Sequence, residues 1–375
     1  MIDSNTVQAP SGLRMIVTGG GTGGHLFPGI AVAEAMLDRF AGSKVLFVGT
    51  ERLIDQKALA NRRFEVTSIR SRGLKGKGVL GKILGLLQVP VSVVAAMRLI
   101  IKFKPEIVFG VGGYVTGPVV LAGRILGVAT AIHEQNSVPG LANRILGRVV
   151  QRVLLSIPGS ESYFPARKCK LSGNPVRSEL LAKGAQAVAD KELSNTLLVL
   201  GGSQGAHRVN SLVVEAIEHV AGELPGDFAV IHQTGVSDEK WVRERYESLG
   251  VRAQVAPFFD EMADLYGAAG LVISRAGATS LAEMTVFGRP SILIPYPFAA
   301  DDHQYGNAQY LVEAGGAILY REQDLDGESL AKELVSLLND KEKRARMGKM
   351  ARQLSLPRAT DAIVDELSSL AVANR

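Results

Sequence analysis

Cysteine is almost absent from this chain of 375 residues, in which Cys169 stands alone. One thiol cannot form an internal disulfide or a four-ligand zinc site, so the sequence favours a reducing compartment and a framework without metal. Long apolar runs are also missing, because Lys82, Pro90 and Arg98 interrupt the most apolar stretch, residues 79–101. Its uncharged part falls short of the ~20 residues of a spanning helix. Residues 1–14 lack the apolar core of a signal peptide, so no export is expected.

Acidic residues are missing from residues 66–105, a segment that contains eight lysines and arginines. The net charge of the whole chain is only +5, so the remainder carries a net charge of −3. The basic character is therefore local. It predicts one cationic surface that meets an anionic partner.

Apolar residues make up 46% of the sequence, and at about 150 residues per domain its length predicts two domains. Short apolar runs that end in Gly or Ser alternate with longer amphipathic stretches. One series extends from residues 15–18 to 153–156, and a second from 196–200 to 317–319. This alternation predicts an α/β chain with two doubly wound parallel sheets of the Rossmann type.

The turn at Gly173–Pro175 predicts the boundary between the two halves. We expect an N-terminal domain over residues 13–175 and a C-terminal domain over residues 176–356. The remaining residues, 357–375, contain an amphipathic segment that predicts a final helix packed on the N-terminal domain.

Both halves open with a strand, a glycine-rich turn and a helix, at residues 15–25 and 198–207. Glycines let the backbone approach a ligand, and a helix N-terminus presents free N–H groups to an anion. The spacing Gly19-x-Gly21-x-x-Gly24 also fits a dinucleotide-binding turn. However, the second strand ends in Gly49-Thr50, where an acid for the ribose is expected. An NAD-dependent oxidoreductase is therefore the least favoured alternative.

Further glycine-rich turns follow at residues 110–118 and 274–280, with neither a P-loop nor an Asp-x-Asp metal motif. In open α/β sheets ligands bind at the carboxyl ends of the strands, so these turns predict a site in the cleft between the domains.

Seven motifs occur in the order found in one family, and the resemblance covers nearly the whole chain. The motifs are Gly20-Gly-Thr-Gly-Gly-His25, Gly112-Gly-Tyr114 with Gly117-Pro118, His133-Glu-Gln-Asn136, Gly173-Asn-Pro-Val-Arg177, Gly201-Gly-Ser-Gln-Gly-Ala206, Arg275-Ala-Gly-Ala278 and Asp302-His-Gln304. The sequence resembles the MurG family, bacterial N-acetylglucosaminyltransferases of peptidoglycan synthesis.

The resemblance implies a GT-B architecture, in which two Rossmann-like domains face each other across a cleft. It implies transfer of N-acetylglucosamine, with inversion, from UDP-N-acetylglucosamine to the 4-hydroxyl of the muramoyl sugar of lipid I, giving lipid II. No metal, cofactor or nucleic acid is expected. The acceptor is a polyprenyl-diphosphate-linked muramyl peptide, which implies a peripheral enzyme at the cytoplasmic face of the plasma membrane.

The resemblance and the residue chemistry together assign candidate site residues. His25 is the expected general base, because the ordinary histidine pKa of about 6.5 suits a proton acceptor at neutral pH, and Glu134 is the reserve. Tyr114 and His133 are expected to hold the acceptor. The expected donor-binding residues are Thr22, Gly23, Gly24, Asn136, Arg177, Ser203, Phe259, Gly277, Ala278, Thr279, Ser280, Leu281, Ala282, Glu283, His303 and Gln304.

Two donor residues have competing interpretations. Ser280 and Glu283 have the spacing of a capping box, whereas the resemblance gives the Glu283 carboxylate to the ribose hydroxyls. Arg177 suits a diphosphate but could also pair with Glu179 as a linker residue.

The basic segment is expected to dock on an anionic membrane without spanning it, although its leucines also fit the core face of a helix. The residues of this prediction are Lys75, Lys77, Lys82, Ile83, Leu84, Leu86 and Leu87. Alternatives for the whole chain are a UDP-N-acetylglucosamine epimerase or glycolipid glycosyltransferase of the same architecture. The non-enzymatic alternative is a module that binds nucleotide sugar and membrane without catalysis.

Overall fold

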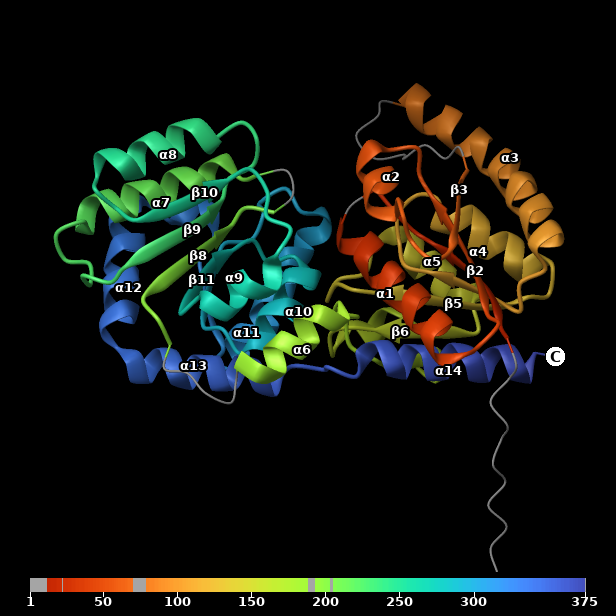
Figure 1. Ribbon diagram of the computed structural model, residues 1–375. Coiled ribbons are helices and arrows are strands. Elements are labelled where there is room, and N and C mark those ends of the chain that lie inside the picture. The colour runs from red at the N-terminus through yellow and green to blue at the C-terminus, as the bar shows by residue number, and fades with distance from the viewer. Residues whose placement is uncertain (1–11, 22, 70–78, 188–192, 203–204, 375) are drawn as a thin grey trace, which may run out of the picture. The chain divides into compact units, whose positions relative to one another are not determined.

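The computed structural model describes residues 12–21, 23–69, 79–187, 193–202 and 205–374. They form two compact units, here called unit 1 and unit 2. Unit 1 contains the described residues up to Gln135, Pro139–Pro175 and those from Arg358 onward; unit 2 contains Asn136–Val138 and Val176–Pro357. Each unit is a parallel sheet covered by helices (Figure 1).

Among its described residues, unit 1 has a seven-stranded parallel sheet in the order β3-β2-β1-β4-β5-β6-β7. The inner strands are buried on both sides, as parallel strands between helix layers must be, which explains their continuous apolar runs. The strands are β1 (Arg14–Thr18), β2 (Lys44–Gly49), β3 (Glu65–Ser68), β4 (Ile107–Gly110), β5 (Ala129–Glu134), β6 (Arg152–Leu155) and β7 (Cys169–Leu171).

Helices cover both faces of this sheet. One core cluster joins the sheet to α1 and α14, and a second joins it to α3, α4 and α5. The helices of unit 1 are α1 (Gly23–Arg39), α2 (Leu53–Leu59), α3 (Val79–Phe103), α4 (Thr116–Ile125), α5 (Leu141–Val149) and α14 (Ala359–Ala373). Although α14 ends the chain, its Ile363, Val364 and Leu367 are buried in the first of these clusters.

Among its described residues, unit 2 has a six-stranded parallel sheet in the order β10-β9-β8-β11-β12-β13. The strands are β8 (Thr196–Leu200), β9 (Ala229–Gln233), β10 (Ala253–Ala256), β11 (Leu271–Ser274), β12 (Ser291–Leu293) and β13 (Ala317–Leu319). The helices are α6 (Ser178–Ala187), α7 (His207–Val220), α8 (Glu239–Ser248), α9 (Met262–Ala268), α10 (Ala278–Phe287), α11 (His303–Glu313), α12 (Gly327–Asn339) and α13 (Lys341–Gln353).

The predicted parallel sheets are confirmed, but the prediction missed the two edge strands of unit 1. Most of β3 is exposed and polar, and β7 has only three residues, so neither shows the apolar run of a buried strand. The predicted strand at residues 153–156 is β6. None of the helices in the described part of the chain is both long and apolar enough to cross a membrane.

A buried histidine in unit 2 is held in its neutral form. His232 is 0% exposed, with Nε2 3.0 Å from Oδ1 of Asn210 and Nδ1 2.9 Å from the Tyr246 hydroxyl. Asn210 donates through Nδ2 to Thr234 O and to Asp238, so its Oδ1 accepts from His232. The Tyr246 hydroxyl then donates to Nδ1. Burial lowers the pKa of His232 to about 3.

This depressed pKa predicts a loss of stability in acid. In the unfolded chain this histidine is protonated below about pH 6.5, whereas in the folded unit it is protonated only below about pH 3. The free energy of unfolding should therefore fall with decreasing pH through this window, by up to ~1.4 kcal/mol per pH unit for one histidine. We expect His232→Gln to make the fall shallower, measured by urea unfolding at pH 7, 6 and 5 with the fluorescence of Trp241 in unit 2. Exposed His219→Gln should keep the wild-type slope; equal slopes in all three proteins would contradict the prediction.

Candidate functional site

The carboxyl edge of the unit 1 sheet gathers the candidate residues of the N-terminal half. Strands β1 and β4 are neighbours although α1, β2, β3 and the helices between them intervene in sequence. Loops from such neighbours leave in different directions, which opens a binding position at the carboxyl ends. The loop after β1 leads to His25, the loop after β4 to Tyr114, and β5 ends at Glu134.

Two glycines let the loops after β1 and β4 approach each other. Gly112 and Gly113 have φ of +104° and +89°. A Cβ on Gly112 would lie 2.6 Å from Nδ1 of His25, and one on Gly113 would lie 2.3 Å from Gly20 O. Any side chain at either position would therefore displace the His25 ring or the first glycine-rich loop.

Asp55, which the sequence analysis did not single out, holds the first glycine-rich loop. This carboxylate on α2 is 0% exposed and accepts from the Gly21 N–H at 3.0 and 3.1 Å. It also accepts from the Thr50 hydroxyl, while Arg52 donates to Gly21 O at 3.0 Å. The carboxylate of Asp55, on the helix after the second strand, is thus engaged with the protein backbone and is not free for the ribose contact of a dinucleotide-binding site.

His25 lies in the first turn of α1 and is partly exposed. Its Nδ1 is 3.1 Å from Oε1 of Gln135. Pro28 is the sixth residue of the helix. Gly23 and Gly24 begin the helix, whereas Thr22 lies outside the described residues.

The two residues before Gln135 are buried. His133 is 0% exposed, and its ring nitrogens lie 3.1 Å from Nε2 of Gln135 and 3.0 Å from Gly173 O. Burial lowers the pKa of His133 to about 4 despite the hydrogen bond to Gly173. Glu134 is 1% exposed and accepts from Nδ2 of Asn143 at 2.8 Å, so it is a buried and hydrogen-bonded carboxylate. Tyr114, by contrast, is 46% exposed.

In unit 2, α10 presents its N-terminus directly after β11. The helix begins at Ala278 with Gly277 as its N-cap, so Thr279, Ser280, Leu281 and Ala282 belong to its first turns. The first N–H groups of a helix have no partner within it and favour an anion. Ser280 is inside the helix and is not its N-cap, so the predicted capping box is wrong: the chain turns at Gly277, three residues earlier.

Glu283 is a buried carboxylate on α10 that the protein itself contacts. It is 8% exposed and accepts from the Tyr266 hydroxyl at 3.2 Å. Arg177 lies 3.8 Å from its other oxygen. Burial raises the pKa of Glu283, and Arg177 and Tyr266 act in the opposite direction. Tyr266, which contacts Glu283, is a residue that the sequence did not indicate.

Asn136, expected to act from the N-terminal domain, belongs to unit 2. Asn307 on α11 is 0% exposed and donates to Oδ1 of Asn136 at 3.1 Å and to Ala276 O at 3.1 Å. It also accepts from the Ser137 N–H at 2.8 Å. Asn307 therefore joins the Asn136 segment, α11 and the loop before α10.

The other donor candidates of unit 2 surround the same strand ends. His303 starts α11, with Nδ1 2.8 Å from Ala300 O, and Oε1 of Gln304 accepts from the Tyr296 N–H at 2.9 Å. Phe259 donates through its N–H to Oε1 of Gln233 at 3.3 Å. Ser203 lies outside the described residues.

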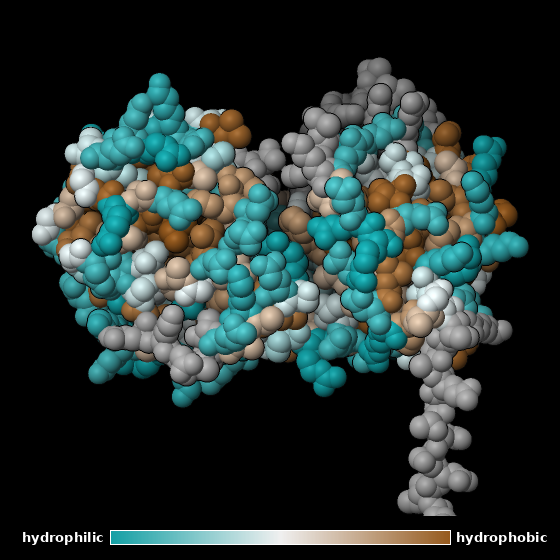
Figure 2. Space-filling view, viewed as in Figure 1, coloured by the Kyte–Doolittle hydropathy of each residue, from teal (hydrophilic) through white to brown (hydrophobic). Residues whose placement is uncertain are grey.

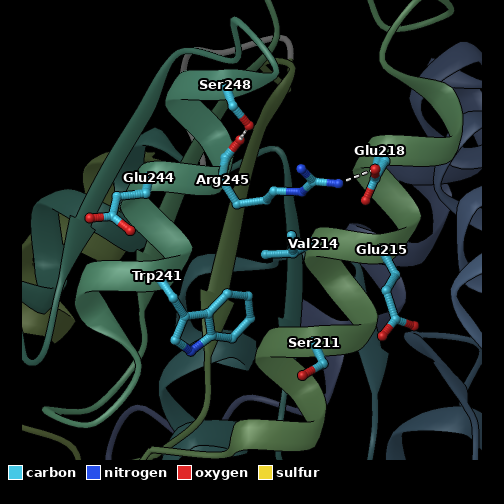
Figure 3. A pocket seen from close by; sticks show the side chains of 8 residues that line it. All are labelled: Ser211, Val214, Glu215, Glu218, Trp241, Glu244, Arg245 and Ser248. Carbon is cyan, nitrogen blue, oxygen red and sulfur yellow. Dashed lines mark hydrogen bonds and ion pairs between the residues drawn. The ribbon is translucent and has the colours of Figure 1, made fainter.

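A separate groove of about 490 Å³ lies between α7 and α8 (Figure 3). Its glutamates already have cationic neighbours: Arg245 for Glu218, Arg208 for Glu215 and Lys240 for Glu244. The groove contains none of the predicted site residues. Its charges are balanced within the protein, so it offers a charged ligand little attraction.

Comparison with known proteins shows the family to which the chain belongs. Residues 15–155 match the glycosyltransferase family 28 N-terminal domain, and residues 196–363 match the C-terminal domain of that family. A protein of Desulfotalea psychrophila is 48% identical over 94% of this chain and 95% of its own length, and one of Geobacter sp. strain M21 is 45% identical over 94% and 95%. Both are named UDP-N-acetylglucosamine--N-acetylmuramyl-(pentapeptide) pyrophosphoryl-undecaprenol N-acetylglucosamine transferase.

Solved structures agree with this placement. The crystal structure of Acinetobacter baumannii MurG is 30% identical, covers 96% of this chain and all of that chain, and has a TM-score of 0.79. A UDP-GlcNAc 2-epimerase from Neisseria meningitidis, at 14% identity, 95% and 99% coverage and a TM-score of 0.67, shares the fold alone. Two Rossmann-like parallel-sheet domains form the GT-B architecture, and the two family matches make the chain a glycosyltransferase of the GT-B type. The chain belongs to glycosyltransferase family 28 and, within it, to the MurG family.

Proposed function

We propose that this glycosyltransferase moves N-acetylglucosamine from UDP-N-acetylglucosamine to the muramoyl 4-hydroxyl of a polyprenyl-diphosphate-linked muramyl peptide. The names of the relatives at 45% and 48% identity specify this donor and acceptor. The observation that carries the proposal is the partly exposed His25, fixed at the carboxyl edge of the unit 1 sheet.

In the proposed reaction, His25 takes the proton of the acceptor hydroxyl. The hydroxyl oxygen forms a bond to the anomeric carbon, the bond from that carbon to the diphosphate breaks, and UDP leaves with the electron pair. Attack from the face opposite the leaving group inverts the anomeric centre. Glu134 is the reserve base, and Tyr114, the exposed aromatic residue of this edge, is proposed to contact the acceptor. His133 has both ring nitrogens engaged inside unit 1, so we assign it a supporting role.

Unit 2 is proposed to hold the donor. The N-terminus of α10 can stabilise the uridine diphosphate without a cation, since backbone N–H groups and the helix dipole favour negative charge. Arg177 is proposed to bind the diphosphate and Glu283 the ribose hydroxyls. His303 and Gln304, at the start of α11, are proposed to bind the sugar.

Turnover with UDP-N-acetylglucosamine and a lipid I analogue, followed by UDP release, tests the proposal directly. We expect His25→Ala to lower kcat by at least ~100-fold while the Kd for UDP changes less than about twofold, because a base acts in the transition state. Near-normal turnover in this variant would remove His25 as the base, and Glu134→Gln is then the next variant. UDP binding without turnover by the wild type would favour the non-catalytic alternative, and release of an epimerised sugar would favour the epimerase.

Glu283→Gln separates donor binding from structural support. The amide keeps the size of the side chain and can still accept from Tyr266, so we expect the melting temperature to change little. A neutral amide accepts hydrogen bonds less strongly than a carboxylate, and the UDP Kd should rise about 10-fold, measured by calorimetry. A destabilised protein with unchanged UDP affinity would show that Glu283 serves the fold alone. Glu179→Gln, on the exposed side of α6, is the matched control.

We also propose that unit 1 docks on the anionic cytoplasmic face of the plasma membrane, where a polyprenyl-linked acceptor resides. Lys75 and Lys77 lie outside the described residues. Lys82, Ile83, Leu84, Leu86 and Leu87 lie in α3, in a part whose side chains the structure does not describe. Further support for this docking comes from the rest of α3 and from the neighbouring helices α4 and α5.

Helices α3, α4 and α5 cover one face of the unit 1 sheet, and each exposes apolar side chains. On α5 the positions i, i+4 and i+8, Leu141, Ile145 and Val149, are exposed, although such a stripe ordinarily faces a core. We define the α3–α5 surface by Val91, Val94, Ile101, Ile125, Leu141 and Ile145 together with the exposed cations Arg98, Lys102, Arg124 and Arg148. Apolar side chains among polar ones are visible on unit 1 in Figure 2.

Mixed apolar and basic surfaces bind anionic lipid, and each cation near the surface adds up to ~1 kcal/mol. We expect wild-type protein to sediment with anionic vesicles more than with neutral ones, and less as salt rises. Binding should fall in a Lys75, Lys77 and Lys82 triple glutamate variant and in a Leu141→Ser, Ile145→Ser double variant. Val236→Ser, exposed in unit 2, should bind as the wild type does. Equal binding to both vesicle types, or no loss in either variant, would overturn this docking.

A further inference from the structure

Gln135 is a buried amide between His25 and His133 at the end of β5. It is 2% exposed, and its Oε1 lies 3.1 Å from Nδ1 of His25. Its Nε2 lies 2.9 Å from Val111 O and 3.1 Å from Nδ1 of His133. The identity of each atom in this chain of contacts follows from the chemistry of its neighbours.

The Val111 carbonyl fixes the orientation of the amide. A backbone carbonyl oxygen can only accept, so the Gln135 atom beside it must be the NH₂ group. The other terminal atom is then the oxygen, which can only accept. Nδ1 of His25 must therefore carry a hydrogen and donate it.

His133 supports the same orientation from the other side. The second N–H of the Gln135 amide meets Nδ1 of His133, which must accept. Its hydrogen then lies on Nε2, which has Gly173 O and the Ser156 hydroxyl oxygen 3.0 Å away as acceptors. The low pKa of His133, about 4 because of burial, keeps this ring neutral and its Nδ1 an acceptor at physiological pH.

We propose that Gln135 is a positioning residue that fixes the neutral His25 ring in the Nδ1–H tautomer and so directs its lone pair to Nε2. The inference rests on the proposed role of His25 as base. Within the described part of the chain, Nε2 of His25 has no hydrogen-bond partner, so it is the nitrogen left to take the acceptor proton. The Nδ1–H stays in place during the step, and the amide oxygen stabilises the imidazolium that forms.

The contact with Gly112 restricts the position of the His25 ring. The His25 ring packs against the glycine so closely that a Cβ there would lie 2.6 Å from Nδ1 and 2.8 Å from Cε1. The ring edge that carries Nδ1 is thus confined between the β4 loop and Gln135. Wrong tautomers disable histidine bases in other enzymes even when the geometry is intact.

Long-range ¹H–¹⁵N correlation spectra of histidine-labelled protein test the tautomer directly, with His25→Ala to assign the signal. At a pH where the ring is neutral we expect the Nδ1–H pattern in the wild type, opposite to the preference of free histidine for Nε2–H. Gln135→Met, of similar size but without donor or acceptor, should lose the Nδ1–H pattern. Gln135→Glu keeps an acceptor for Nδ1–H and should retain it. The Nε2–H pattern in the wild type, or an unchanged pattern in Gln135→Met, would overturn the proposal.

Kinetics provide the second measurement. Gln135→Met should lower kcat by about 10- to 100-fold with a donor KM within about twofold, and Gln135→Glu should recover part of the loss. Gln151→Met removes an amide that accepts from the Thr130 N–H at 2.7 Å on the same sheet, and should leave the tautomer of His25 unchanged. The spectra need no substrate, so a histidine that proves not to be the base leaves the tautomer result standing. A Gln135→Met variant with normal kcat and an altered tautomer would reject the catalytic part of the inference.

Discussion

The close approach of two glycine-rich loops at the carboxyl edge of the unit 1 sheet is the constraint on which the candidate site depends. The backbone at Gly112 and Gly113 has positive φ and leaves no room for a Cβ beside His25 and Gly20. Asp55 holds the first loop through the Gly21 N–H, and Gln135 holds the His25 ring. The partly exposed imidazole thus lies between Gly112 and Gln135, on a loop that Asp55 holds.

In unit 2, too, candidate residues lie at the carboxyl edge of the sheet. There the chain leads from the strands to the N-terminus of α10 at Gly277 and to the buried carboxylate of Glu283. The carboxylate is costly to bury, and Tyr266 and Arg177 offset part of that cost. An arrangement that retains such a charge close to a helix N-terminus suits recognition of a ligand with both hydroxyl and anionic groups.

The order of the motifs and the alternation of apolar runs with amphipathic stretches were sufficient to predict the fold and the family. Parallel strands buried on both sides need continuous apolar runs, so the sequence alone predicted β1, β4, β5, β8 and β11. The edge strands β3 and β7 were not, because an edge strand needs no such run. The start of α10 was predicted wrongly for a related reason. The capping-box spacing of Ser280 and Glu283 is a local pattern, whereas the loop after β11 ends at Gly277, so the helix begins before Ser280.

The sequence by itself determined the two Rossmann-like units, the glycine-rich turns and the candidate residues, because these depend on local periodicity and on short spacings along the chain. Only the tertiary structure decided what those residues contact. Asp55, Gln135, Tyr266 and Asn307 reach partners that are 17 to 171 residues away in the sequence. The burial of His133 and Glu134 was likewise settled only by folding, since their exposure depends on strands and helices distant in the chain.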